Sequence, residues 1–222
     1  MTDIPHPSST RVRLARAAIV VAGIDLWFLS QSLIATRTPP LGKIDDGMHR
    51  LLASWHDYFL AHDSAANALM IVSSAFIDGL AIFVLLRAIF GPSIRPMIGL
   101  GLLFVLRQLC QALVSLPTPE GMIWHNPGVP AILVTYGVAT DLFFSGHTSV
   151  AVFGSLELGR SGRRWLALGC AIATFEALTV LTLRAHYTMD VYAAAMTALV
   201  AAFVAEKIAP ACDAAIEKCA GA

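Results

Sequence analysis

Long apolar runs, separated by short polar or proline-containing stretches, dominate the hydrophobic pattern of this chain. A helix needs about 20 consecutive, mostly apolar residues to cross a bilayer. Six segments qualify or nearly do, the fourth being short, and they cover residues 14–35, 66–90, 97–116, 145–158, 165–183 and 187–208. The pattern therefore predicts an all-α, polytopic membrane protein with six transmembrane helices in one bundle.

The segment between the first two runs has a different period. Its apolar residues recur at three- and four-residue steps, and they are Ile44, Met48, Leu51, Leu52, Trp55 and Phe59. Charged residues lie off this stripe, which is typical of an amphipathic helix in a membrane interface. We therefore expect an interfacial amphipathic helix here, either as an anchor on the rim of the bundle or as a lid over a functional site.

Composition supports the membrane assignment. The 222 residues are 57% hydrophobic with a mean hydropathy of +0.70, which is too apolar for a soluble domain. The formal net charge is zero and no basic stripe lies beside an aromatic platform, so nucleic-acid binding is not expected. The four cysteines show neither a disulfide framework nor Cys-x-x-Cys metal spacing. We therefore treat residues 1–222 as a single integral membrane domain and expect no metal.

The positions of Lys and Arg predict how the helix bundle is oriented across the membrane. They cluster before the first run, between the second and third, between the fourth and fifth, and after the sixth. All four places fall on the same side of an up-and-down six-helix path, and the positive-inside rule makes that side cytoplasmic. The opposite side carries the 117–144 loop and two histidines, His147 and His186, which each begin an apolar run. We expect both on the outer face, and the compact, alanine-rich helices suggest a bacterial inner membrane with a periplasmic site.

Each of these histidines has neighbours suited to phosphoryl-transfer chemistry. His186 and Asp190 lie four residues apart at a helix start, so the carboxylate can hold one ring nitrogen and leave the other free as a base or nucleophile. His147 follows Ser145 and Gly146, and the exposed amides of such a helix N-terminus favour a bound phosphate. A lone His at a helix end is more often a capping residue, but two histidines and a partnered Asp favour a shared site.

These motifs resemble those of known lipid enzymes. The Ser-Gly-His sequence at 145–147, followed one helical hairpin later by His-x-x-x-Asp at 186–190, resembles the type-2 phosphatidic acid phosphatase superfamily of six-helix membrane enzymes. The Asp-Leu-Phe-Phe that precedes the first motif is more similar to sphingomyelin synthases and their relatives. Arg107 followed by Leu-Pro-x-Pro at 116–119 is also similar to a motif of that family.

The chain departs from both groups at particular positions. None of its three lysines lies in the Lys-x6-Arg-Pro frame of the lipid phosphatases, and Val180 stands where their third motif has an Arg. The resemblance, which covers roughly residues 107–191, therefore favours the synthase branch. Ala-Thr at 139–140 replaces the Cys-Gly that usually precedes the aspartate of the synthases.

The resemblance implies a two-step phosphotransfer without a metal or other cofactor, in a catalytic core at about 97–208. His186, oriented by Asp190, would attack the phosphorus of a glycerophospholipid donor and form a phosphohistidine. His147 would protonate the departing diacylglycerol oxygen and then activate a ceramide-like or diacylglycerol acceptor. Two alternatives stay open: water as the acceptor, which gives a lipid phosphatase or phospholipase C, and a non-enzymatic lipid-transport bundle. A homo-oligomer is compatible with the sequence.

Further polar residues are candidates for substrate binding, beside Ser145 and Gly146. Charges inside membrane helices are costly, so Arg107 is expected to face the bundle interior, either as a phosphate ligand or paired with Asp78 or Asp141. Asp141 would orient the nearby histidine or stabilise its loop.

Two more charged residues lie near the predicted site. Arg184, two residues before His186, would either clamp phosphate or mark the membrane interface. Glu120 is a weaker candidate for binding a cationic headgroup or assisting His147.

Aromatic residues near the predicted site form either a choline cage or an interfacial belt, and they are Trp55, Trp124, Tyr136, Phe143 and Phe144. The intramembrane acids Asp25, Asp78 and Glu176 receive no catalytic role.

Overall fold

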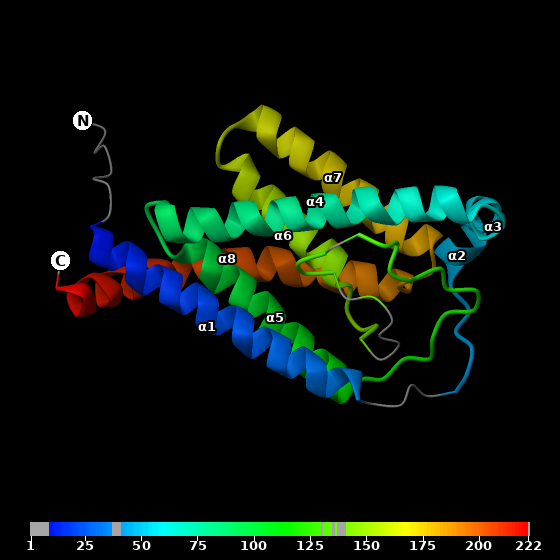
Figure 1. Cartoon of the computed structure of the whole chain (residues 1–222), viewed down its shortest axis with the longest axis horizontal. Helices are drawn as coiled ribbons and strands as arrows, with labels where there is room; N and C mark the ends of the chain where they lie inside the picture. Colours follow the sequence, from blue (N-terminus) through cyan, green and yellow to red (C-terminus); the bar gives the residue numbers. More distant parts are fainter. Residues whose placement is uncertain (1–8, 37–40, 130, 135, 137–140, 222) are drawn as a thin grey trace.

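The computed structural model describes residues 9–36, 41–129, 131–134, 136 and 141–221. Within them the chain forms eight helices and no strand, which confirms the all-α prediction. The helices are α1 (Thr10–Ala35), α2 (Gly47–Leu51), α3 (Ala53–Ala61), α4 (Asp63–Phe90), α5 (Arg95–Leu113), α6 (Gly146–Gly159), α7 (Arg163–Thr182) and α8 (Thr188–Ala220). Figure 1 shows the start of α1 and the end of α8 at one end of the bundle, and α2 and α3 at the other end.

Five helices are long and apolar enough to cross a membrane, namely α1, α4, α5, α7 and α8. The helix predicted at 145–158 is present as α6, but its 14 residues measure roughly 21 Å against a hydrocarbon core of about 30 Å. Nine of those residues are buried, and α6 packs against α4, α7 and α8. The structure therefore supports five spans around one short interior helix, and the six-span prediction is not confirmed.

The C-terminal end of α6 is fixed to one end of the bundle. Arg95 Nη2, at the start of α5, donates to Glu157 Oε2 of α6 at 2.6 Å, and both side chains are buried. Because α6 is short and its C-terminus is held at that end, its N-terminus lies inside the bundle. The site predicted around His147 therefore starts from a buried helix end.

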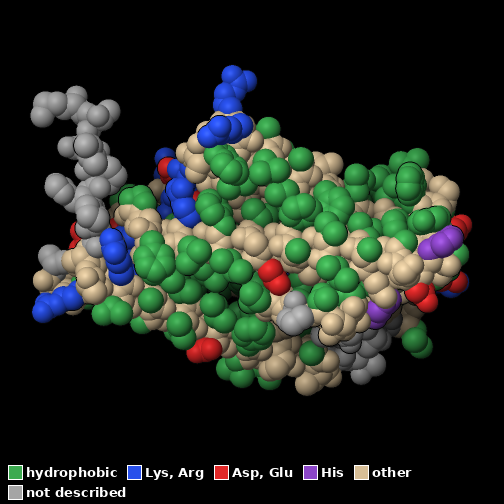
Figure 2. Space-filling model, turned by 45° about the horizontal axis from the view of Figure 1, so that its top comes forward, with side chains coloured by type: hydrophobic (Ala, Val, Ile, Leu, Met, Phe, Trp, Pro, Cys, Tyr) green, Lys and Arg blue, Asp and Glu red, His purple; other side chains and the backbone are tan. Residues whose placement is uncertain are grey.

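Most of the visible Lys and Arg side chains gather at the end that carries the termini, as Figure 2 shows. Arg16 is buried there, and it donates to the carbonyl oxygen of Gly91 at 2.7 Å and to Asp213 Oδ1 at 2.8 Å. Asp213 belongs to α8, which continues well beyond the predicted end at residue 208. The sequence pattern missed this extension because its residues are no longer uniformly apolar.

The predicted amphipathic helix is two short helices, α2 and α3. Leu51 and Trp55 of the apolar stripe are 72% and 62% exposed. Asp46, His49 and His56 are buried instead. Leu51 and Trp55 face outward, where they are free to contact lipid, whereas Phe59 of the same stripe packs against the bundle. Polar side chains also hold the segment to the bundle.

Candidate active site

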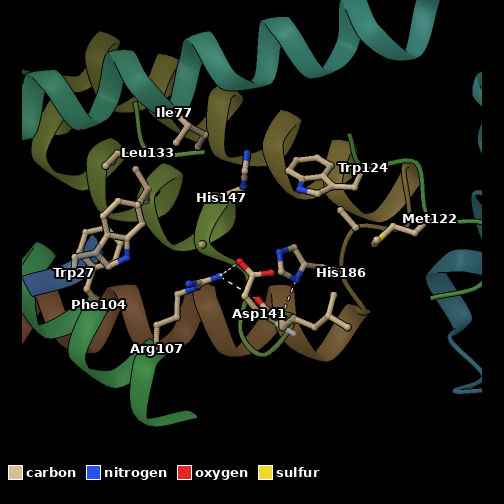
Figure 3. A pocket seen from close by; sticks show the side chains of 14 residues that line it. Trp27, Ile77, Phe104, Arg107, Met122, Trp124, Leu133, Asp141, His147 and His186 are labelled. Carbon is tan, nitrogen blue, oxygen red and sulfur yellow. Dashed lines mark hydrogen bonds and ion pairs between the residues drawn. The ribbon is translucent and has the colours of Figure 1, made fainter. Parts of the chain in front are cut away.

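The N-terminus of α6, the α7–α8 loop and α5 enclose a pocket of about 50 Å³. Five residues predicted for the site line it, and these are Arg107, Asp141, Gly146, His147 and His186. Figure 3 shows the two histidines and the Arg107–Asp141 pair arranged around this one space. The structure thus brings together two histidines that are 39 positions apart in the sequence.

His186 lies in the α7–α8 loop, and a backbone carbonyl fixes its tautomer. Its Nδ1 lies 2.8 Å from the carbonyl oxygen of Leu142. A carbonyl only accepts hydrogen bonds, so Nδ1 carries the proton and Nε2 keeps its lone pair. The imidazole is therefore prepared as a nucleophile or base at Nε2.

Asp190 supports this loop in a different way from the one predicted. Its Oδ2 accepts a hydrogen bond from Tyr187 N at 2.9 Å, which caps the start of α8. The same oxygen lies 3.6 Å from His186 Nδ1, which is an ion-pair distance but too long for a hydrogen bond. The expectation that Asp190 holds the ring is corrected, because Leu142 takes that hydrogen bond and the fully buried Asp190 acts on the ring only through its charge.

His147 is the second residue of α6 and is buried. Ser145 caps the helix, since its side chain accepts from Thr148 N at 3.3 Å. His147 Nε2 has no hydrogen-bond partner among the described residues, and the ring meets Trp124 edge-on at a centroid distance of 5.0 Å. An uncommitted ring nitrogen beside the other histidine is suited to proton transfer with a bound substrate.

Arg107 is paired, as one of the two sequence interpretations expected. Its guanidinium donates to Asp141 Oδ2 at 3.2 Å, to Gln31 Oε1 at 3.2 Å and to the carbonyl oxygen of Phe144 at 3.1 Å. A Cβ at Gly146 would lie only 3.3 Å from Arg107 Nε, so glycine allows this close approach. Asp141 therefore stabilises the loop before α6, and Gln31 is a participant that sequence reasoning missed.

The segment comprising Asp46, α2 and α3 supports the site through polar residues that the sequence analysis did not single out. Asp46 Oδ1 accepts from His49 N at 3.1 Å, and its Oδ2 accepts from Thr188 N at 2.7 Å, so one carboxylate caps both α2 and α8. His49 Nε2 donates to the carbonyl oxygen of His186 at 2.9 Å, and His56 Nδ1 donates to that of Thr182 at 2.9 Å. These bonds hold both ends of the loop that carries His186.

The charge states of this segment follow from its surroundings. Burial acts to raise the pKa of the Asp46 carboxyl, but hydrogen bonds from Thr188 and His49 outweigh burial and lower it. Burial lowers the pKa of His56, and the charge of Arg184 lowers it further against the opposing hydrogen bond to Thr182. At neutral pH the segment therefore docks with an ionised Asp46 and a neutral His56.

Arg184 and Glu120 lie outside the pocket of the two histidines. They line a separate polar pocket of about 420 Å³, where Arg184 Nη1 donates to the carbonyl oxygen of Glu120 at 2.8 Å. The Glu120 carboxylate is exposed and pairs with Lys43 Nζ at 2.9 Å. The predictions that these residues contact the headgroup or assist His147 therefore receive no support from the geometry.

The remaining candidates are placed as follows. Asp78 accepts from Ile132 N at 2.8 Å, and the buried Glu176 accepts from Ser73 Oγ at 2.6 Å, whereas Asp25 is exposed on α1. Of the predicted aromatic cage only Trp124 lines the pocket, where it is joined by Trp27 and Phe104. The first helix thus contributes an aromatic ring to the site, which the sequence motifs gave no reason to expect.

Over residues 45–207, the chain matches the family model AtPDCT1/2, which describes a phosphatidylcholine:diacylglycerol cholinephosphotransferase family. The chain belongs to this family. No curated protein and no solved structure matches the chain. The matched region contains both histidines and excludes α1. Family membership agrees with a phospholipid headgroup phosphotransferase that acts on membrane lipids, and it gives no indication of a sphingolipid acceptor.

Proposed function

We propose that this protein exchanges phosphocholine between phosphatidylcholine and diacylglycerol through a phosphohistidine at His186. The observation that carries the proposal is the pair of uncommitted ring nitrogens in one pocket. His186 Nε2 is left free because Nδ1 is bonded to Leu142, and His147 Nε2 has no hydrogen bond to any described residue. Family membership supports phosphatidylcholine and diacylglycerol as the substrates.

In the first step, His186 Nε2 attacks the phosphorus of phosphatidylcholine. The new P–N bond forms as the bond from phosphorus to the glycerol oxygen breaks, and His147 donates a proton to that oxygen. Diacylglycerol leaves, and phosphocholine remains on His186. The nearby Asp190 carboxylate stabilises the positive charge that develops on the His186 ring.

In the second step, His147 takes the proton of an incoming diacylglycerol hydroxyl. The oxygen attacks phosphorus, the P–N bond breaks, and His186 is restored. Because the bond formed is of the same kind as the bond first broken, the exchange is close to thermoneutral and runs equally well in both directions. The reaction therefore redistributes headgroups among diacylglycerols without changing the total of either lipid.

Two features of the pocket suit the charges of this substrate. The N-terminus of α6 and the Arg107 guanidinium lie at the pocket wall, where they stabilise negative charge that develops on phosphate oxygens. Trp27, Phe104 and Trp124 present aromatic surfaces on which a quaternary ammonium group is held by cation–π contact.

We further propose that the site opens to the outer leaflet. The Lys- and Arg-rich end of the molecule is cytoplasmic by the positive-inside rule, and the pocket lies toward the other end. A cysteine placed at the exposed Asn126 should react with an impermeant maleimide in intact cells, whereas the exposed native Cys219 should react only after permeabilisation. Labelling in the reverse order would refute this orientation.

The direct test is a headgroup exchange assay with purified protein in vesicles. Unlabelled phosphatidylcholine and deuterated diacylglycerol should give deuterated phosphatidylcholine and an equal amount of unlabelled diacylglycerol. The variant His186→Ala should give neither, and equal activity in that variant would refute the histidine mechanism.

Separate assays distinguish this exchange from the alternative activities. Ceramide in place of diacylglycerol tests the sphingomyelin synthase resemblance, and product there would extend the acceptor range. Free phosphocholine released without any acceptor would identify a hydrolase on the same scaffold. Movement of lipid between leaflets without chemical change would identify a transporter.

A further inference from the structure

A second, larger cavity lies between α1 and α5. Its volume is about 550 Å³, within the range of about 300–1,000 Å³ for ligand pockets. It extends along α5 from Met97 to Ala112, which is roughly 22 Å by helical rise, compared with ~15 Å for the hydrocarbon of one leaflet. Its walls are almost entirely apolar. One of them, α1, lies outside residues 45–207, the region that the family model matches. We refer to this cavity as the α1–α5 groove.

The α1–α5 groove adjoins the histidine pocket. Trp27, Phe104 and Leu133 line both cavities. The rings of Trp27 and Phe104 are stacked with centroids 5.1 Å apart, so they form the partition between the two spaces. The histidine pocket has room for only a few water molecules, and a bound lipid must therefore use space on both sides of this partition.

A polar atom at the partition lacks a partner. Trp27 is 6% exposed, and its Nε1–H donates no hydrogen bond to any residue that the structure describes. A buried donor without an acceptor is costly, so an unpartnered indole N–H points to a ligand that supplies the acceptor. An ester carbonyl at the junction of glycerol and acyl chain is an acceptor of the right kind.

We propose that the α1–α5 groove binds the diacylglycerol moiety that donor and acceptor share, with Trp27 Nε1 donating to a glycerol ester oxygen. This inference rests on the proposed function and goes beyond it by assigning the acyl-chain site. In a two-step exchange the diacylglycerol that leaves and the one that enters are chemically alike, so one groove serves both steps. Its rim residues Leu26 and Leu109 are 63% and 54% exposed, which opens the groove sideways to the bilayer.

Two glycines provide a matched pair of variants. A Cβ at Gly101, which lines the groove, would meet nothing within 4 Å, and the same is true at Gly79 of α4 outside the groove. Gly101→Leu therefore fills the groove without a clash at Cβ, and Gly79→Leu adds the same side chain elsewhere. Both variants should fold, which size-exclusion chromatography and thermal unfolding in detergent check.

The binding experiment uses a diacylglycerol that carries a photoreactive diazirine at the end of one acyl chain. Wild type and Gly79→Leu should be labelled on peptides of α1 and α5, and Gly101→Leu should reduce that labelling about tenfold. Equal labelling of all three proteins, or labelling confined to other helices, would overturn the groove assignment. This readout does not require transfer, so an inactive wild type that is still labelled here would refute the proposed function and leave the groove standing.

A kinetic experiment tests the Trp27 contact. Trp27→Phe keeps an aromatic ring at the partition but removes the N–H, so the KM for diacylglycerol should rise about five- to tenfold, as for the loss of one hydrogen bond, with kcat little changed. An unchanged KM would remove the hydrogen bond from the proposal, and a fall in kcat alone would indicate a structural role instead.

Discussion

At the scale of single residues, the preparation of His186 depends on a backbone carbonyl. In a Ser-His-Asp triad the carboxylate fixes the histidine tautomer, and replacing that Asp by Asn costs about 10⁴-fold in kcat because the tautomer is lost. Here the Leu142 carbonyl accepts from Nδ1, and Asp190 lies 3.6 Å away. The triad carboxylate both orients the histidine and stabilises its charge. Here the Leu142 carbonyl orients the ring, and the Asp190 carboxylate is the group placed to stabilise its charge.

This division predicts the effect of Asp190→Asn. The amide oxygen can still accept from Tyr187 N, and Leu142 still holds the tautomer, so only the negative charge near the ring is lost. We expect kcat for headgroup exchange to fall roughly 10- to 100-fold, the usual loss for a partner one step removed from the reacting atoms. A loss near that of His186→Ala would mean that Asp190 sets the tautomer after all, and full activity would exclude its charge from the mechanism.

The sequence predicted the chemical identity of the central residues because their types and spacing are visible in it. His147, Gly146 and His186 line one pocket, as the two helix starts indicated. The Leu142 carbonyl could not be predicted, since every residue carries a carbonyl and only the folded loop selects one. Gln31 offered a signal, as a polar residue in an apolar run, but nothing in one sequence connects it to Arg107.

At the scale of elements, the α2–α3 segment shows how distant polar partners decide which polar side chains of a helix are buried. Leu51 and Trp55 point outward, whereas His49 and His56 are buried because their rings find backbone acceptors in the α7–α8 loop and at the end of α7. Buried polar groups need such partners, and the partners lie more than 100 positions away in the sequence. The helical spacing was therefore readable from the sequence, but the choice of buried face was not.

The docking of this segment should depend on pH through His56. The pKa of His56 is lowered below 6.5 by burial, so docking favours the neutral ring and an undocked ring binds protons more readily. Docking is therefore complete above about pH 6.5 and weakens as the pH falls toward the lowered value, where His56 gains charge near Arg184. Hydrogen exchange at residues 47–61, corrected for intrinsic rates, should speed up across this range.

The control for this prediction is His56→Gln, which keeps an N–H donor but does not titrate. Its exchange at residues 47–61 should show little dependence on pH in the same range. Asp46 stays ionised there, because its pKa is lowered from 3.8. Identical pH profiles in wild type and the variant would show that another group controls docking.

At the scale of the whole molecule, the two ends of the bundle are held by different means. The end with the site combines hydrogen bonds to backbone carbonyls with the Arg107–Asp141 pair, whereas the other end relies mainly on ion pairs such as Arg16–Asp213 and Arg95–Glu157. The approximate positions of the five long helices could be predicted from apolar length, but the extension of α8 beyond residue 208 could not. The interior position of α6 could not, because a short apolar run fits both a short span and a buried helix.

The ion pair of α1 and α8 should matter for stability. Asp213→Ala leaves Arg16, which is 1% exposed, without its counter-charge, and we expect a loss of about 3 kcal/mol in the free energy of unfolding. Glu206→Ala is the control, because its partner Arg160 is half-exposed and such pairs contribute less than about 1 kcal/mol. Thermal unfolding in detergent compares the two, and equal losses would contradict this account.

In the proposed mechanism, His186 carries the phosphocholine group between donor and acceptor. The most direct measurement is mass spectrometry of peptides from protein incubated with phosphatidylcholine alone and quenched under mildly alkaline conditions. We predict a phosphocholine adduct on His186 that disappears when diacylglycerol is added and is absent in His186→Ala. Exchange that proceeds at full rate with no adduct in wild type, or with the adduct on another residue, would contradict the claim.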